Sequence, residues 1–95
     1  MRVLTTDVFC GAYLMTHQGA RLVDLIVDGT GVRPSGTFVF EGDDLLEAQQ
    51  VYSRGEAIAS VKEIRDGVTH LRTCLARALR RVSSRRHPEA EVANL

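Results

Sequence analysis

The sequence predicts a small single-domain α+β fold in the order helix, strand, strand, helix, helix, with an antiparallel hairpin packed on the helices and a long C-terminal helix. Three observations support this prediction. Apolar residues recur at steps of three and four over 61–82, segments 21–28 and 37–41 are rich in branched or alternating apolar residues, and hydroxyl or acidic residues precede each helix-like segment. The chain has 95 residues, which is enough for one domain that folds without disulfides or metals.

The first predicted helix begins after Thr5 and Thr6, because a hydroxyl N-cap followed by the acid Asp7 is typical of a helix start. It ends at Gly19, where a residue without a Cβ fits a left-handed C-cap. Gly11 in its interior costs about 1 kcal/mol relative to alanine. We therefore expect another backbone segment to approach closely at Gly11.

The two predicted strands, 21–28 and 37–41, form the antiparallel hairpin, joined by a loop that contains glycines and a proline. Segment 37–41 alternates, so Phe38 and Phe40 face the helices, and Thr37 and Glu41 face away. A short extended stretch at 56–59 is a candidate third strand at the sheet edge.

The second predicted helix begins at Asp43 and Asp44 and ends at Gly55. Asp44 and Glu47 have the spacing of a capping box, with aspartate in place of the usual serine or threonine. Its expected buried stripe consists of Leu45, Ala48 and Tyr52.

The long helix begins with a second capping box, Ser60 to Glu63, and runs over about 61–84. From residue 87 onward, a proline followed by small and acidic residues predicts a disordered tail over 87–95, so the domain covers 1–86. The apolar seam predicts that Leu71 and Leu75 at its centre are buried. The seam consists of Val61, Ile64, Val68, Leu71, Leu75, Ala78 and Val82.

A helix of this length, ~36 Å, is longer than the rest of a small domain can cover. Ala78, Leu79 and Val82 are therefore expected to project with exposed apolar atoms. A second copy of the same segment would cover them most simply.

Formal net charge is zero, but the charges are separated along the chain. Residues 1–61 hold four arginines against eight acids, a net charge of −4, and residues 62–87 hold eight basic residues against two acids, a net charge of +6. The remaining two glutamates lie in 88–95. The long helix therefore combines an apolar seam with a basic surface, which is typical of an interaction element.

We predict a non-enzymatic interaction module that self-associates or docks to a partner protein through the long helix. In a two-fold dimer the arginines would meet the acid-rich body, for instance Asp43, Asp44 and Glu47. The alternative is an accessory nucleic-acid-binding protein that holds phosphates with the same arginines, although overall neutrality and the absence of aromatic residues beside them weigh against it. The predicted interaction residues are Arg72, Arg77, Arg80, Arg81, Arg85, Arg86, Ala78 and Val82.

No catalytic residue, metal site or cofactor is predicted. His70 and Cys74 stand four apart on one helical face, but Cys10 and His17 are seven apart, ~10 Å along another helix. A Cys₂His₂ site from these four residues would require the two helices to meet edge to edge, and no CxxC or HxxxH pattern supports it. Both thiols lie in apolar patterns that do not favour reactivity, and no glycine-rich loop matches a phosphate-binding motif.

The sequence also predicts a cytoplasmic protein. Thr5, Thr6 and Asp7 interrupt any apolar core that a signal peptide would need. No apolar run approaches the ~20 residues of a membrane span. We therefore expect both cysteines to be reduced and buried.

Several short motifs, spread over residues 5 to about 80, resemble a family of short bacterial and phage domains of unknown function. This resemblance implies the α+β layout but no activity, because the matching residues are caps, core positions and a helix stop. The loop from Asp28 to Gly36 is longer than expected for that family. The motifs are Thr6 and Asp7 with Ala12, Leu14 and Gly19; Phe38 to Glu41; Tyr52 to Ala57; and Leu71 with Arg72.

Overall fold

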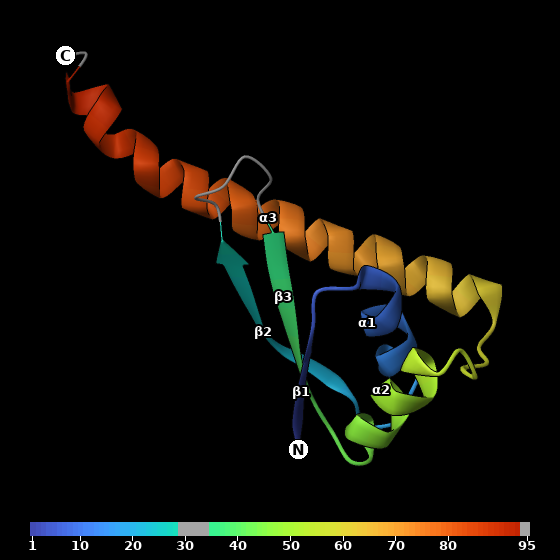
Figure 1. Ribbon diagram of the computed structural model, residues 1–95. Helices are drawn as coiled ribbons and strands as arrows, with labels where there is room; N and C mark the ends of the chain where they lie inside the picture. The colour runs from blue at the N-terminus through green and yellow to red at the C-terminus, as the bar shows by residue number, and fades with distance from the viewer. Residues whose placement is uncertain (29–34, 94–95) are drawn as a thin grey trace.

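The computed structural model describes the backbone at residues 1–28 and 35–93, and the side chains at 1–27 and 36–81. The predicted α+β class is confirmed, and the five predicted elements occur in the predicted order (Figure 1). One strand, which was not predicted, precedes them. The elements are β1 (Arg2–Thr5), α1 (Val8–Met15), β2 (Arg21–Asp28), β3 (Ser35–Glu41), α2 (Leu45–Ser53) and α3 (Val61–Ala93).

The three strands form one antiparallel sheet in the order β1-β3-β2, so the last strand in sequence is the central one. Segment 56–59, which was predicted as a candidate third strand at the sheet edge, is not a strand in this structure. The third strand is β1, which pairs with β3. As predicted, Phe38 and Phe40 are buried in the core. Val39 is also buried although it points to the opposite face, because β1 and β2 flank it on both sides through Leu4 and Asp24.

The helices pack on the sheet through close contacts at glycines. A Cβ on Gly11 would lie 2.8 Å from Leu71 Cδ1 and 3.2 Å from Phe40 Cε2, so side chains, rather than the expected backbone, occupy the space beside it. The close approach of backbone occurs instead at Gly67, where a Cβ would lie 3.1 Å from Ala12 Cα. These two glycines allow α1 to pack closely against both α3 and the sheet.

The start of α1 differs from the prediction. Asp7 is the N-cap, and its carboxylate accepts hydrogen bonds from Phe9 N at 2.9 Å and Cys10 N at 3.3 Å. Thr5 lies at the end of β1, where its Oγ1 accepts from Asp7 N. Asp7 directly precedes Val8, the first residue of α1, so its carboxylate rather than a threonine hydroxyl reaches the first free amides of the helix.

The predicted capping boxes are confirmed only in part. Asp44 takes a left-handed conformation with φ of 59° and makes no side-chain cap bond, so its predicted box with Glu47 is wrong. Ser60 Oγ accepts from Glu63 N at 3.0 Å, which is one half of the second predicted box. Gly55, at φ of 76°, ends α2 as predicted.

The long helix α3 extends to Ala93, beyond the predicted end near residue 84. Segment 87–93 is therefore helical in this structure, in contrast to the predicted tail; residues 94 and 95 lie outside the described part. We had taken Pro88 as a stop because it lacks an N–H and forfeits one backbone hydrogen bond. The glutamates and alanine that follow it are strong helix formers, which favour continuation.

The described part of the α3 seam is buried at its centre and exposed at its N-terminal end. Leu71 is fully buried as predicted, Leu75 and Ala78 are half-buried, and Val61 is exposed. Figure 1 shows α3 crossing the sheet and continuing past it, in a molecule 55 Å long and about half as wide. Within the described part of the chain, no helix has both the length and the hydrophobicity that a membrane span requires.

Candidate interaction surface

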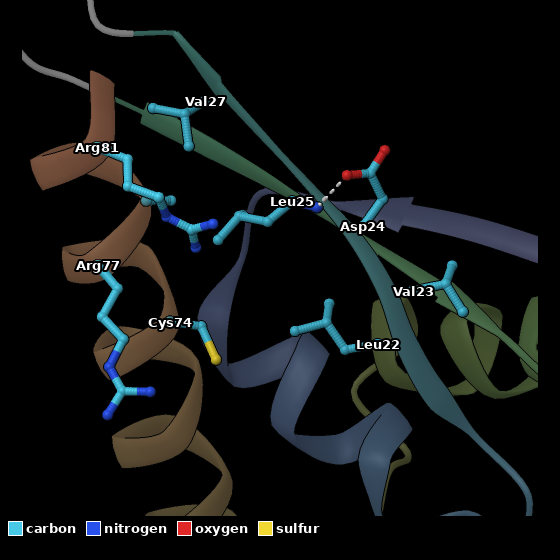
Figure 2. Close-up of a pocket in the computed structure, with 9 residues that line it drawn as sticks. Leu22, Val23, Asp24, Leu25, Val27, Cys74, Arg77 and Arg81 are labelled. Atoms are coloured by element: carbon cyan, nitrogen blue, oxygen red, sulfur yellow. Dashed lines mark hydrogen bonds between the residues drawn. The ribbon is translucent and has the colours of Figure 1, made fainter. Parts of the chain in front are cut away.

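An open groove lies between α3 and the edge strand β2 (Figure 2). Beside this groove, Leu75 of α3 packs closely on Gly36 of β3. A Cβ on Gly36 would lie only 2.5 Å from Leu75 Cδ1, so the absence of a side chain at Gly36 makes room for this contact. The groove has a volume of about 500 Å³, and its floor includes the apolar side chains of Leu22, Leu25 and Val27. It is lined by Leu22, Val23, Asp24, Leu25 and Val27 of β2 and by Cys74, Arg77, Ala78 and Arg81 of α3.

Arg77 and Arg81 place two guanidinium groups along the helix side of this groove (Figure 2). Asp24 is the acid of its lining, but its carboxylate lies on the far side of β2 and accepts a hydrogen bond from Leu25 N at 2.8 Å. Among the described side chains, the ion pairs are Arg2–Glu41, Arg21–Glu41 and Arg54–Glu56, and none involves α3. Within that part of the chain, the two groove arginines therefore carry positive charge without an acidic partner.

The structure brings together only some of the predicted interaction residues. Arg77, Ala78 and Arg81 share the groove, whereas Arg80 turns back along the helix and donates from Nε to the carbonyl of Ala76 at 3.4 Å. Residues four apart share a helix face, but Arg80 precedes Arg81 by about 100° of rotation.

Arg72 lies on the other flank of α3, beside an apolar hollow that includes Phe9 and Val68. The predicted arginine surface is therefore divided between two faces of the helix. The side chains of Val82, Arg85 and Arg86 lie outside the described residues.

The floor of the groove was not anticipated from the sequence. Leu22, Leu25 and Val27 lie about fifty residues from the arginines that they face. The branched aliphatic residues of 21–28 indicated a strand, but they did not indicate which other element would lie beside the edge of that strand.

The predicted acidic contact, Asp43, Asp44 and Glu47, lies at the start of α2. All three are exposed. Figure 1 shows that this end of α2 is remote from the far half of α3, so these acids do not meet the groove arginines within one chain.

The cysteines and histidines are not gathered into one site. Cys10 is buried in the core, and this burial raises the pKa of its thiol, which is the opposite of what a reactive thiolate needs. His17 packs edge-on against Tyr13, with ring centroids 5.0 Å apart. Cys74, half-buried rather than buried as expected, has its Sγ 3.7 Å from Nε2 of His70. Over the described residues, no three potential metal ligands lie together.

One polar contact ties α2 to the start of α1. The hydroxyl of Tyr52 donates to Asp7 Oδ2 at 2.8 Å, while Oδ1 of the same carboxylate caps α1. Burial, together with this bond and the nearby negative charge, raises the pKa of Tyr52 to about 12. This hydrogen bond links α2 to the start of α1, and neither Tyr52 nor Asp7 lines one of the grooves described here.

Comparisons with models of protein families, with curated proteins and with solved structures give no match. The resemblance to short bacterial and phage domains therefore stays a prediction. Function has to be argued from the surface of this chain.

Proposed function

We propose that this protein is a small non-enzymatic interaction module that self-associates through α3. The observation that supports this most is the groove between α3 and β2, which combines an apolar floor with Arg77 and Arg81. Covering apolar surface contributes about 25 cal/mol per Å². A partner that brings apolar side chains and carboxylates to the same place fits the groove best.

A second copy of the chain has that composition. Residues 1–61 carry a net charge of −4, so two copies have complementary basic and acidic regions. An interface related by a two-fold axis forms each such contact twice. Self-association therefore needs no partner of unknown chemistry.

Nucleic-acid binding is the second candidate. Residues 61–81 of α3, whose side chains the structure describes, include six basic residues, and none of these is in an ion pair with another described residue. Such cations hold phosphates without sequence preference. They point in several directions around the helix, however, which favours this function less than the groove favours self-association. The six are Lys62, Arg65, Arg72, Arg77, Arg80 and Arg81.

A matched pair of variants separates the two functions. Ala78 lies in the groove and Ala76 is exposed elsewhere on α3, so Ala78→Arg and Ala76→Arg add the same charge at different places. We expect Ala78→Arg to fill the groove and convert a dimer into a monomer, and Ala76→Arg to leave the dimer intact. Light scattering over a concentration series measures the mass.

The same two variants test nucleic-acid binding. Each adds a cation, so a phosphate-binding helix retains DNA or RNA at least as well in both variants as in the wild type. A wild-type chain that is monomeric at high concentration and retains nucleic acid would favour the second function. A chain that does neither would contradict both.

A further inference from the structure

One flank of α3 carries a column of six side chains whose charge changes from negative to positive along the helix. Their spacing of three or four residues places them on one helical face. The column begins with two acids, has a histidine and a cysteine at its centre and ends with two arginines. It consists of Glu63, Asp66, His70, Cys74, Arg77 and Arg81.

This column borders two neighbouring hollows. Its basic half forms the helix side of the groove with β2, and its acidic half lines a second hollow of about 310 Å³ between α3 and α1. All of its side chains are exposed except Cys74, which is half-buried. A second helix can therefore reach the column along its length.

The charges of the column are self-complementary: when a second copy of α3 runs antiparallel to the first, the acids of one copy face the arginines of the other. Glu63 and Arg81 lie at equal distances on either side of residue 72, and Asp66 and Arg77 do so to within one residue. An antiparallel copy of α3, related by a two-fold axis near residue 72, places each acid opposite an arginine of the other copy. This arrangement uses acids of α3 itself rather than the distant acids of α2.

His70 and Cys74 lie closest to that axis, two residues on either side of it. Their Nε2 and Sγ atoms are 3.7 Å apart. Two ligands of one tetrahedral zinc ion, with bonds of about 2.0–2.1 Å to nitrogen and 2.3 Å to sulfur, are separated by about 3.6 Å. The pair thus already has the spacing of half a zinc site. The same axis brings the second pair from the other copy.

We propose that two copies bind one Zn²⁺ between antiparallel α3 helices, through Nε2 of His70 and Sγ of Cys74 from each copy. This inference rests on the proposed self-association and names its geometry. On binding, each thiol releases its proton to solvent, so two thiolates balance the charge of the ion. The remaining ligands are two neutral imidazoles, which completes a Cys₂His₂ set.

The test begins with metal-free protein and added Zn²⁺, followed by light scattering and calorimetry. We expect one ion per two chains and a shift of the equilibrium toward the dimer that a chelator reverses. Cobalt(II) in place of zinc is expected to give the strong visible absorption of tetrahedral thiolate coordination. Binding of one ion per chain, or no effect of zinc on mass, would overturn the proposal.

Variants at the two ligands provide the controls. His70→Ala changes an exposed side chain, and Cys74→Ser replaces sulfur by oxygen at nearly constant size. Both are expected to lose the cobalt spectrum and the zinc-dependent dimer while circular dichroism stays unchanged. Cys10→Ser is the matched thiol variant and is expected to keep both signals if it folds; His17→Ala serves the same purpose on α1.

The antiparallel register has its own test. Glu63→Arg and Arg81→Glu are each expected to weaken the dimer, and the double variant to restore it, because the reversed pair has the same complementarity. Failure of the double variant to recover would overturn this register. A dimer that forms equally in zinc, in chelator and in His70→Ala overturns the zinc site but leaves self-association in place, whereas a monomer under every condition overturns both.

Discussion

Leu71 lies where α1, β3 and α3 meet, fully buried and within reach of Gly11. Leu71→Ala removes buried methyl groups and leaves a cavity, so we expect it to lower the free energy of unfolding by about 2–5 kcal/mol. Leu75→Ala is expected to cost less because Leu75 is only half-buried. Urea denaturation measures both. A loss below about 1 kcal/mol for Leu71→Ala would show that the seam is not packed.

Gly67 sets the distance between α1 and α3. Helix propensity alone predicts that Gly67→Ala stabilises the protein by about 1 kcal/mol. The added Cβ would lie 2.9 Å from the Cβ of Ala12, however, and 3.1 Å from its Cα. We expect the clash to dominate and the variant to be less stable by about 1–3 kcal/mol. Thermal unfolding distinguishes the two signs, and the double variant with Ala12→Gly should recover part of the loss.

Tyr52 gives the fold a measurable dependence on alkaline pH. Its pKa is raised from 10.0 to about 12, chiefly by burial and also by its bond to Asp7. The folded state therefore holds this proton more tightly than the unfolded state, so the stabilisation is fully present below pH 10 and is lost as pH rises toward 12. We expect the melting temperature of the wild type to fall more steeply over this range than that of Tyr52→Phe. Equal slopes would contradict the raised pKa.

At the scale of elements, the two faces of α3 are expected to behave differently. Arg81→Glu and Arg80→Glu change the charge equally, but Arg81 lines the groove and Arg80 bonds back to its own helix. For a dimer through the groove, only Arg81→Glu weakens association; for nonspecific phosphate binding, both variants reduce retention to a similar extent. Light scattering and nucleic-acid retention, measured on both variants, separate the cases.

Local patterns in the sequence were sufficient to predict most of the elements. The alternation in 37–41 placed Phe38 and Phe40 correctly, and the seam placed Leu71. Strand β1 was missed because four residues carry little periodicity and their pairing partner lies at 38–41. The predicted interaction residues included Arg77, Ala78 and Arg81, which line the helix side of the groove, but the groove itself was not predicted because its β2 side depends on packing between distant segments.

At the scale of the whole molecule, the separation of charge predicts a salt dependence. Screening lengths fall from about 10 Å at 0.1 M salt to about 3 Å at 1 M. If opposite charges pair across the interface, the dissociation constant of the dimer should rise with salt. Sedimentation of the wild type from 0.05 to 1 M salt measures this. A dissociation constant that stays constant or falls would indicate that apolar contact alone holds the copies together.

The contact of Leu75 with Gly36 also determines how far α3 reaches beyond its packed half. Ala93 lies 18 residues further along α3, ~27 Å from Leu75 at the helical rise. A tilt of about 5° about Leu75 corresponds to a displacement of ~2 Å at Ala93 over this length. A partner that binds near Ala93 would therefore act on α3 at a long distance from the residues that hold the helix on the domain.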